Sequence, residues 1–242
     1  MKNNVCILTG QIGCGKSTIA QKLNTLGYNV FDADDIVRFL QQPGQYCYNQ
    51  IVKNFQNIVL EDKQLDRKQI SQQVFGPQNM EKLQLLNKIV HPQVNKQIKK
   101  ILFFNIFKLK ILSGIPQDCI YNRYNKALIV VIPLWLEQSK KTIFPVFDIQ
   151  LSSQEEQIKR LLNRGHSHQD AVNRIKAQMS FDERRKRANR VFINDSPDTN
   201  ILVQQLSQYI NNYQGGTLYT IYQHITQIIF ILLVVIVYLV IF

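Results

Sequence analysis

The amino-acid sequence predicts an α/β fold in three layers, with a five-stranded parallel sheet between helices, on three observations. A short apolar stretch near the N-terminus leads through a glycine-rich loop into a helical pattern. Four further stretches are short, apolar and rich in β-branched residues, and helical patterns separate them, as is typical of buried parallel strands. The interval 41–126 has helical periodicity without a comparable strand, so we expect a helical insertion there.

The expected strands share an apolar character that a strand buried on both faces requires. A length of 242 residues suits one domain with an inserted or lid subdomain, and it leaves no room for a second catalytic domain. In chain order, the five expected strands are Val5–Thr9, Asn29–Phe31, Leu128–Ile132, Phe144–Asp148 and Val191–Ile193.

Residues 10–17 form the most specific motif of the chain. They read Gly-Gln-Ile-Gly-Cys-Gly-Lys-Ser, the phosphate-binding pattern G-x-x-x-x-G-K-[ST], between a strand and a helix. Its glycines let backbone N–H groups converge on a polyphosphate at the positive end of the helix. We expect Lys16 to contact the β- and γ-phosphates of ATP and Ser17 to ligate Mg²⁺. The expected nucleotide contacts here are Gly13, Cys14, Gly15, Lys16, Ser17 and Thr18.

Carboxylates follow the second expected strand, at the strand ends where ligands bind in open α/β sheets. Alternation puts Asp32 and Asp34 on one side, where they can accept a proton from an attacking hydroxyl and help to orient Mg²⁺. Arg38 lies one helical turn beyond Asp34, at a spacing that permits an ion pair or a contact with a second phosphate. The alternative is a solvated, aspartate-rich helix cap.

The formal net charge of +12 raises the question of a nucleic-acid partner. The basic residues cluster in a helical stretch, 159–190, and the sequence has no recognisable nucleic-acid-binding module. A kinase needs such charge to hold the phosphates of two substrates, so we expect no nucleic-acid partner. At least half of the run is expected to be a solvated helix face.

The four cysteines show no paired C-x-x-C spacing, and no signal peptide precedes the first strand. We therefore expect reduced thiols in a protein that faces the cytosol. For Cys14, which lies in the phosphate loop near Lys16, the sequence favours a small residue that the loop tolerates. The alternative is that exposure and the charge of Lys16 lower the pKa of the thiol and open it to oxidation or alkylation.

The sequence resembles the dephospho-coenzyme A kinase family over residues 3 to about 210. Residues 8–18, L-T-G-Q-I-G-C-G-K-S-T, resemble the family's L-T-G-G-I-G-S-G-K-S-T, and 32–38 match its D-A-D-x-[IL]-x-R element. Residues 132–137 resemble its P-L-L-F-E segment. The family's substrate-side helices are resembled by residues 65–67 with 74–75 and by 86–92. Its lid helices are resembled by 157–164 and 174–179, and its final strand and turn by 193–194.

The resemblance implies transfer of the ATP γ-phosphoryl group to the ribose 3′-hydroxyl of dephospho-coenzyme A, the last step of coenzyme A biosynthesis. It implies that Asp34 accepts or orients the hydroxyl proton, with Asp32 in support. Arg160 and Arg164, four residues apart, are expected to share a helix face and to close over the phosphates as a lid.

The resemblance also implies contacts around the two substrates. Asn194 would lie on the adenine side of ATP, and Arg67 and His91 on the side of the acceptor substrate. For His91, which precedes Pro92, a structural role in a helix turn is at least as well supported. A separate adenylyltransferase that makes the acceptor is a candidate partner.

Outside the phosphate loop, four segments depart from the family pattern. This chain has Ala188-Asn189 where family members often have Ala-Asp, and Phe55-Gln56 where they usually have Phe-Gly. Residues 194–197, Asn-Asp-Ser-Pro, stand for Asn-x-Gly, and the lid turn 164–167 has no acidic residue after its arginine. These departures bear on the adenine contacts and on the movement of the lid.

The C-terminal residues change abruptly in composition after Gly215-Gly216. Between Ile225 and Phe242 only Thr226 and Gln227 are not apolar, and a helix of this length spans about 27 Å, close to the core of a bilayer. We expect a tail anchor in the mitochondrial outer or endoplasmic reticulum membrane, with the kinase facing the cytosol. A final core helix or a buried strand is the alternative.

These patterns divide the chain into segments. We expect a kinase domain over 1–212, with a substrate-binding insert at about 41–126 and a lid at about 155–188. A linker over 213–217 and a transmembrane tail over 218–242 would follow. The other functions considered are a different nucleoside or nucleotide kinase and a catalytically degenerate nucleotide-binding membrane scaffold. A GTPase switch is excluded because N-K-x-D and D-x-x-G motifs are absent from the sequence.

Overall fold

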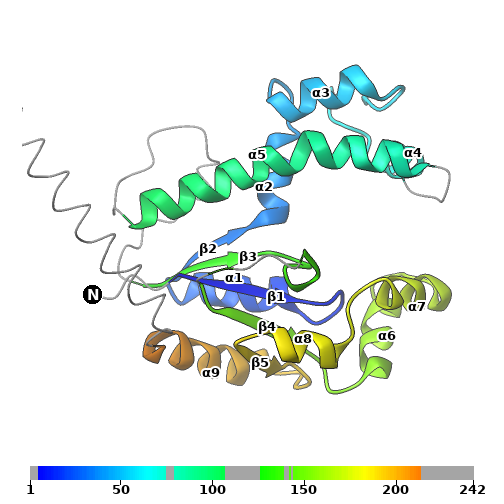
Figure 1. Ribbon diagram of the computed structural model, residues 1–242. Coiled ribbons are helices and arrows are strands. Elements are labelled where there is room, and N and C mark those ends of the chain that lie inside the picture. The colour runs from blue at the N-terminus through cyan, green and yellow to red at the C-terminus, as the bar shows by residue number, and fades with distance from the viewer. Residues whose placement is uncertain (1–4, 75–78, 107–125, 139–141, 143, 214–242) are drawn as a thin grey trace, which may run out of the picture. The chain divides into compact units, whose positions relative to one another are not determined.

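The computed structural model describes residues 5–74, 79–106, 126–138, 142 and 144–213 (Figure 1). Its contacts divide these residues into two compact units. Of the described residues, the sheet unit comprises 5–31, 105–106, 126–138, 142 and 144–213, and the helical unit comprises 32–74 and 79–104. Each unit is described by itself.

The centre of the sheet unit is a five-stranded sheet in the order β2-β3-β1-β4-β5. Strand β1 pairs in parallel with β3 on one side and β4 on the other, and β4 pairs in parallel with β5. This confirms the expected parallel sheet and all five strands. Their bounds are β1 Val5–Gly10, β2 Asn29–Asp32, β3 Leu128–Val131, β4 Val146–Gln150 and β5 Arg190–Ile193.

Strand β4 begins and ends two residues later than the sequence predicts. The predicted strand, 144–148, ended at Asp148. In the structure Asp148 and Gln150 are both fully buried within β4. Asp148 is tolerated there because a buried arginine neutralises it, as described below.

Serine side chains set the beginnings of the three helices that follow β4. Ser153, Ser167 and Ser180 each accept a hydrogen bond from a backbone N–H in the first turn of the helix they precede. Ser180 and Glu183 complete a reciprocal capping box. The helices of the sheet unit are α1 Lys16–Thr25, α6 Gln154–Leu162, α7 His168–Lys176, α8 Phe181–Arg187 and α9 Thr199–Asn212, with a short 3₁₀ helix, η3, at Leu136–Gln138.

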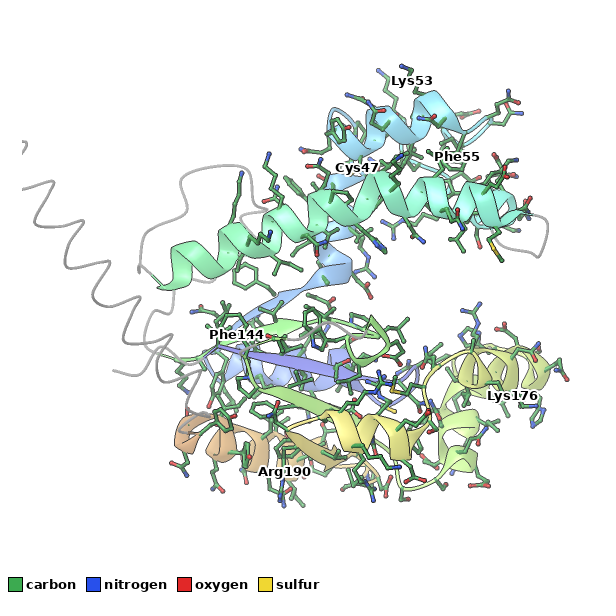
Figure 2. All side chains as sticks on the ribbon, viewed as in Figure 1. Cys47, Lys53, Phe55, Phe144, Lys176 and Arg190 are labelled. Carbon is green, nitrogen blue, oxygen red and sulfur yellow. The ribbon has the colours of Figure 1, made fainter. Side chains whose placement is uncertain are left out.

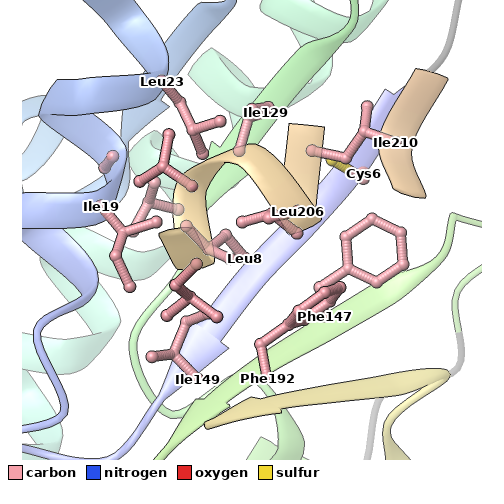
Figure 3. Close-up of a cluster of buried hydrophobic side chains, with 14 of the residues drawn as sticks. Cys6, Leu8, Ile19, Leu23, Ile129, Phe147, Ile149, Phe192, Leu206 and Ile210 are labelled. Atoms are coloured by element: carbon pink, nitrogen blue, oxygen red, sulfur yellow. The ribbon is translucent and has the colours of Figure 1, made fainter. Parts of the chain in front are cut away.

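Helices α1 and α9 pack on the sheet through one apolar core (Figure 3). Ile19 and Leu23 of α1 meet Leu206 and Ile210 of α9 over the strands. Phe147 of β4 lies in this core with no exposed surface, and its ring meets other rings edge to face. The centroid distances are 6.1 Å to Phe192, 5.4 Å to Tyr209 and 5.9 Å to Tyr213.

The described part of the predicted helical interval contains helices joined by turns, and an isolated antiparallel bridge links Val59 with Leu65. Cys47 and Phe55 are buried in the helical unit, and the Cys47 thiol donates a hydrogen bond to the Ile89 carbonyl (Figure 2). The limits of this interval as a substrate-binding insert stay a prediction. The helices are α2 Ala33–Leu40, α3 Tyr46–Asn54, α4 Arg67–Val74 and α5 Met80–Ile106.

Among the described residues, none of the helices is both long and apolar enough to cross a membrane. The expected tail anchor, 218–242, lies outside the described residues, so it stays a prediction.

Replacement of Phe147 by alanine is expected to lower the free energy of unfolding by about 3–5 kcal/mol, because it opens a cavity beside the three rings that Phe147 contacts. A urea titration measures the change. The control is Ile201→Ala on α9, where the side chain is 56% exposed, and where we expect a change within about 0.5 kcal/mol. Equal losses in the two variants would contradict the placement of Phe147 at the centre of the core.

Candidate active site

The phosphate loop connects β1 to α1 in a shape that two of its glycines make possible. Gly10 has φ 155°, and a Cβ there would lie 2.4 Å from the Ile149 carbonyl oxygen. Gly15 has φ 85°, and a Cβ there would lie 2.3 Å from Nδ2 of Asn194. Because any larger residue would collide at both positions, the glycines let the loop lie close to β4 and to the end of β5.

The first turn of α1 is a site for an anion. Its N-cap, Gly15, offers no side chain to the first N–H groups, and the turn contains no acidic residue. Ser17 and Thr18 are exposed there. The Lys16 ammonium donates a 2.8 Å hydrogen bond to the Gln11 carbonyl within the same loop. The positive end of the helix, two hydroxyls and an ammonium therefore lie together where a polyphosphate would bind.

Arg160 adds a second cation beside the loop. Its Nε pairs with Glu156 at 3.0 Å, and its Nη2 donates to the Asn194 carbonyl at 2.8 Å. Its Nη1 lies 3.9 Å from the position a Cβ would take at Gly15. The Asn194 side chain in turn donates to the Cys14 carbonyl at 2.8 Å. Arg160 and Asn194 thus lie against the phosphate loop, while a contact of Asn194 with adenine stays a prediction.

The second lid arginine is placed differently from the prediction. Helix α6 ends at Leu162, and Arg164 lies exposed in the turn that follows, where its backbone N–H donates to the Leu161 carbonyl. The expectation that Arg160 and Arg164 share a helix face is wrong. The reason is local, because Gly165 takes φ 87°, a left-handed conformation that ends the helical path.

Two departures from the family pattern have structural roles. The Asn189 side chain accepts a hydrogen bond from the Val146 N–H at 2.7 Å, beside the pairing of β4 with β5. Asp195 accepts from the Ser152 N–H at 2.9 Å, which joins the segment after β5 to the segment after β4. In the lid turn, His166 contacts Asp170 at 2.7 Å, so an acidic partner comes from α7.

A buried ion-pair network, which the sequence analysis missed, lies next to the loop. Arg184 of α8 has no exposed surface, and its guanidinium pairs with Asp148 at 2.6 Å and with Glu137. It also donates to the hydroxyl of Thr9, the residue before Gly10, at 3.2 Å. Burial disfavours the charged guanidinium, but Asp148 and then Glu137 outweigh it and raise the pKa of Arg184. The charge is therefore permanent.

The sequence held a signal for this network. Arg184 lies in a basic run of which at least half was expected to be solvated, so its burial was not foreseen. Asp148 in an otherwise apolar strand implies a buried cation as its partner. The capping box at Ser180 sets where α8 begins and hence which of its residues share a face.

The candidate carboxylates lie in the helical unit, at the start of α2. Asp32 is the N-cap and accepts a 2.9 Å hydrogen bond from the Asp34 N–H. Burial raises the pKa of Asp32 to about 6, although the bond from the Asp34 N–H acts in the opposite direction. Arg38 pairs with Asp35 at 2.6 Å. Of the two roles that its spacing permitted, the ion pair with Asp34 is therefore wrong, and the contact with a second phosphate stays a prediction. The Asp34 side chain is exposed.

Arg67 and His91, the other predicted substrate residues, are exposed on the helical unit. Arg67 is the first residue of α4, which Asp66 caps by accepting from the Lys68 and Gln69 N–H groups. His91 lies inside α5, which continues through Pro92. The structure thus places the loop, Arg160 and Asn194 together in the sheet unit. Asp32, Asp34, Arg38, Arg67 and His91 belong to the helical unit.

Cys14 is the small, tolerated loop residue that the sequence favoured, and the alternative of a reactive thiol is wrong. Its side chain has no exposed surface. Burial raises the pKa of the thiol to about 11, and the charge of Lys16 lowers it by less than burial raises it. Cys14 is therefore a small, protonated residue within the fold of the loop.

The residues beside the loop fit a magnesium ion that arrives with a nucleotide. Within the described ranges, no group of three or more His, Cys, Asp or Glu side chains lies close enough to hold a metal. The exposed Ser17 hydroxyl supplies one oxygen ligand in the first turn of α1. Mg²⁺ commonly keeps waters and binds through substrate phosphates with few protein ligands, so this donor set suits it.

The parallel sheet, the glycine loop at a helix N-terminus and the adjacent cations define a nucleotide-binding protein of the P-loop kinase class. Residues 4–200 match the family model described as dephospho-CoA kinase. The chain belongs to the dephospho-CoA kinase family and is a kinase.

Relatives and solved structures agree with this assignment. A dephospho-CoA kinase of Carboxydothermus hydrogenoformans is 38% identical over 77% of this chain and 84% of its own length. Dephospho-CoA kinase CAB5 of Saccharomyces cerevisiae is 32% identical over 90% of this chain and 86% of its own length. TT1252 from Thermus thermophilus superposes with a TM-score of 0.66 at 26% identity, over 89% of this chain and 100% of that one. Dephospho-CoA kinase from Campylobacter jejuni superposes with a TM-score of 0.57 at 25% identity, over 87% of this chain and 98% of that one.

We expect Cys14 to resist alkylation by iodoacetamide at pH 8 while the protein is folded. A thiol with a pKa near 11 stays protonated at pH 8 and is also shielded from the reagent. Mass spectrometry of tryptic peptides should find Cys14 unmodified without denaturant and fully modified in 6 M guanidinium, as a solvent-exposed thiol would be. Rapid modification of the folded protein would contradict its burial.

Proposed function

We propose that this kinase transfers the γ-phosphoryl group of ATP to the ribose 3′-hydroxyl of dephospho-CoA, the last step of coenzyme A biosynthesis. The observation that carries the proposal is the family match over residues 4–200, which spans the phosphate loop, the carboxylates at α2 and the lid helices. The reaction needs a phosphate-binding loop, cations near the transferred group and a base for the hydroxyl, and the chain has a candidate for each.

The donor nucleotide would bind at the loop. Backbone N–H groups of the loop and of the first turn of α1 would hold the phosphates, and Lys16 would leave the Gln11 carbonyl to meet them. Ser17 would hold the Mg²⁺ ion, which supplies positive charge to the β- and γ-phosphate oxygens when bound. Arg160 would neutralise charge that develops on the transferred group.

Asp34 is the stronger candidate for the base of the two carboxylates. Asp32 is engaged as the N-cap of α2, where it accepts the Asp34 N–H. Asp34 is exposed and carries its carboxylate at the start of the same helix. Asp34 would accept or orient the proton of the 3′-hydroxyl, and Asp32 would hold the first turn of α2 in place.

The remaining predicted contacts belong to the same proposal. Arg164, from the exposed turn after α6, would approach the phosphates as the lid closes and excludes water. Arg38, Arg67 and His91 would contact dephospho-CoA, and Asn194 would contact adenine. An adenylyl transfer must supply the acceptor, and a separate adenylyltransferase is a candidate partner.

Release of ADP should depend on the acceptor substrate. With Mg·ATP we expect turnover with dephospho-CoA and none with adenosine, AMP or CoA. Lys16→Ala should lower kcat by about 10²–10³-fold because a transition-state cation is lost. Asp34→Asn should lower it by about 10²–10⁴-fold because the amide cannot accept the proton.

The matched control for Asp34→Asn is Asp35→Asn. Asp35 is the next residue of α2, is similarly exposed and keeps an oxygen for Arg38 after the change. We expect its kcat to stay within about twofold of wild type, as for a surface substitution. Circular dichroism should show that all three variants are folded. Near-wild-type turnover by Asp34→Asn would remove its assignment as the base, and turnover with AMP alone would favour a nucleotide kinase.

We further propose that residues 218–242 anchor the kinase to a membrane, with the catalytic domain facing the cytosol. The support is in the sequence, because Ile225–Phe242 has no charge and a helical length of about 27 Å. The absence of charged flanking residues leaves the mitochondrial outer and endoplasmic reticulum membranes equally supported.

Deletion of residues 217–242 is expected to leave a folded, active kinase that no longer sediments with phosphatidylcholine vesicles, whereas the full chain does. The control is the full-length Val234→Lys, Val237→Lys double variant, whose charges should each cost about 2.5–3.5 kcal/mol in the bilayer and abolish sedimentation. Loss of folding on truncation would instead assign the tail to the core.

A further inference from the structure

Three glutamines tie the phosphate loop to the lid. The Gln157 side chain donates a 2.7 Å hydrogen bond to the Ile12 carbonyl, and the Gln178 side chain accepts one of 3.0 Å from the Ile12 N–H. The Gln11 side chain donates a 2.5 Å bond to the Met179 carbonyl. We call Gln11, Gln157 and Gln178 the amide clasp. Both backbone polar groups of Ile12 are therefore held by side chains from the lid.

The clasp joins elements that are far apart in the sequence. Gln157 lies within α6, and Gln178 and Met179 lie between the end of α7 and the Ser180 cap of α8. All of these residues belong to the sheet unit, so their contacts lie within one compact body. Lys176, the last residue of α7, marks this end of the lid in Figure 2.

Burial makes these bonds expensive to break. Gln11 is 2% exposed and Gln157 is 0% exposed. An amide at such a position that lost its partner would bear the cost of desolvation without compensation. The loop itself resists order, because Gly13 and Gly15 take positive φ values and glycine loses the most backbone freedom on folding. Bonds to Ile12 reduce that freedom before any ligand binds.

We propose that Gln11, Gln157 and Gln178 are positioning residues that hold the phosphate loop in its anion-binding shape through Ile12 and Met179. Because the Ile12 N–H donates to Gln178, it is not offered to a phosphate. The three glutamines therefore affect nucleotide binding through the backbone shape of the loop. The clasp couples the loop to both ends of the lid, so ATP affinity depends on residues remote in the sequence. The inference rests on the proposed function only in naming ATP as the nucleotide.

Gln11 gives the clasp one hydrogen bond more than the family's loop sequence could form. The resembling loop, L-T-G-G-I-G-S-G-K-S-T, has glycine where this chain has Gln11. A glycine has no side chain to reach the Met179 carbonyl, so this third bond is particular to loops with a long donor at this position.

The test replaces each clasp residue by methionine, which has a similar length but neither the amide donor nor the amide acceptor. The readouts are the affinity for a non-hydrolysable ATP analogue with Mg²⁺, by calorimetry, and hydrogen exchange of the loop amides without nucleotide. Gln11→Met, Gln157→Met and Gln178→Met should each weaken binding about fivefold to tenfold, as expected for the loss of one partly buried hydrogen bond. Exchange of the loop amides should accelerate in parallel.

The matched control is Gln154→Met. Gln154 lies on α6 and lines the same cavity of about 250 Å³ as the three clasp residues, but it is exposed. Its affinity and exchange should equal those of wild type. Gln11→Gly is a second variant that removes the bond without adding a buried side chain, in case Gln11→Met does not fold.

The outcomes separate the clasp from the proposed function. Unchanged affinity in the clasp variants would overturn the inference, even with a lower melting temperature, because the role would then be structural only. ATP binding without turnover of dephospho-CoA would overturn the proposed acceptor and leave the clasp supported if the variants bind more weakly. Absence of ATP binding by the wild-type protein would overturn both.

Discussion

The sheet unit depends on Arg184, whose guanidinium has no exposed surface. A charge buried in this way must be paired with groups of opposite charge. Arg184 binds Asp148 of β4, Glu137 of η3 and Thr9 of β1, so one side chain of α8 joins three segments of the chain. Gln150 adds bonds to Asp148 and to the Phe181 carbonyl at the start of α8. Because a buried pair that loses one partner costs about 3–5 kcal/mol, these segments are fixed relative to one another.

The phosphate loop inherits its position from this arrangement. Thr9 is the last residue before Gly10, and α8 follows the segment that carries Gln178 and Met179. The amides of Gln157, Gln178 and Asn194 also hold the loop. The positive charges of Lys16 and Arg160 lie beside it with the N-terminus of α1, although Lys16 donates to the Gln11 carbonyl and Arg160 pairs with Glu156. The same loop can therefore be rigid and remain attractive to a polyphosphate.

Several features were predictable because they depend on contiguous residues. The strand periodicity predicted all five strands, and the glycine pattern predicted the nucleotide loop before α1. The predictions that failed concern side chains whose partners lie elsewhere. For Cys14, the alternative of a pKa lowered by its neighbour Lys16 failed, because burial outweighs that charge and raises the pKa. Arg164 was expected to continue a helix that Gly165 helps to end.

By itself, the sequence determined the class of fold, the phosphate loop and the family of this protein. These follow from periodicity and from local motifs, in which each residue's role depends on its near neighbours in the chain. Only the tertiary structure decided that Arg184 is a buried ion-pair partner, that Asn194 braces the loop and that three glutamines clasp it. The physical reason is that polar side chains occur equally well on solvated faces. A glutamine or arginine becomes structural only when folding brings an unpaired buried group within hydrogen-bonding distance.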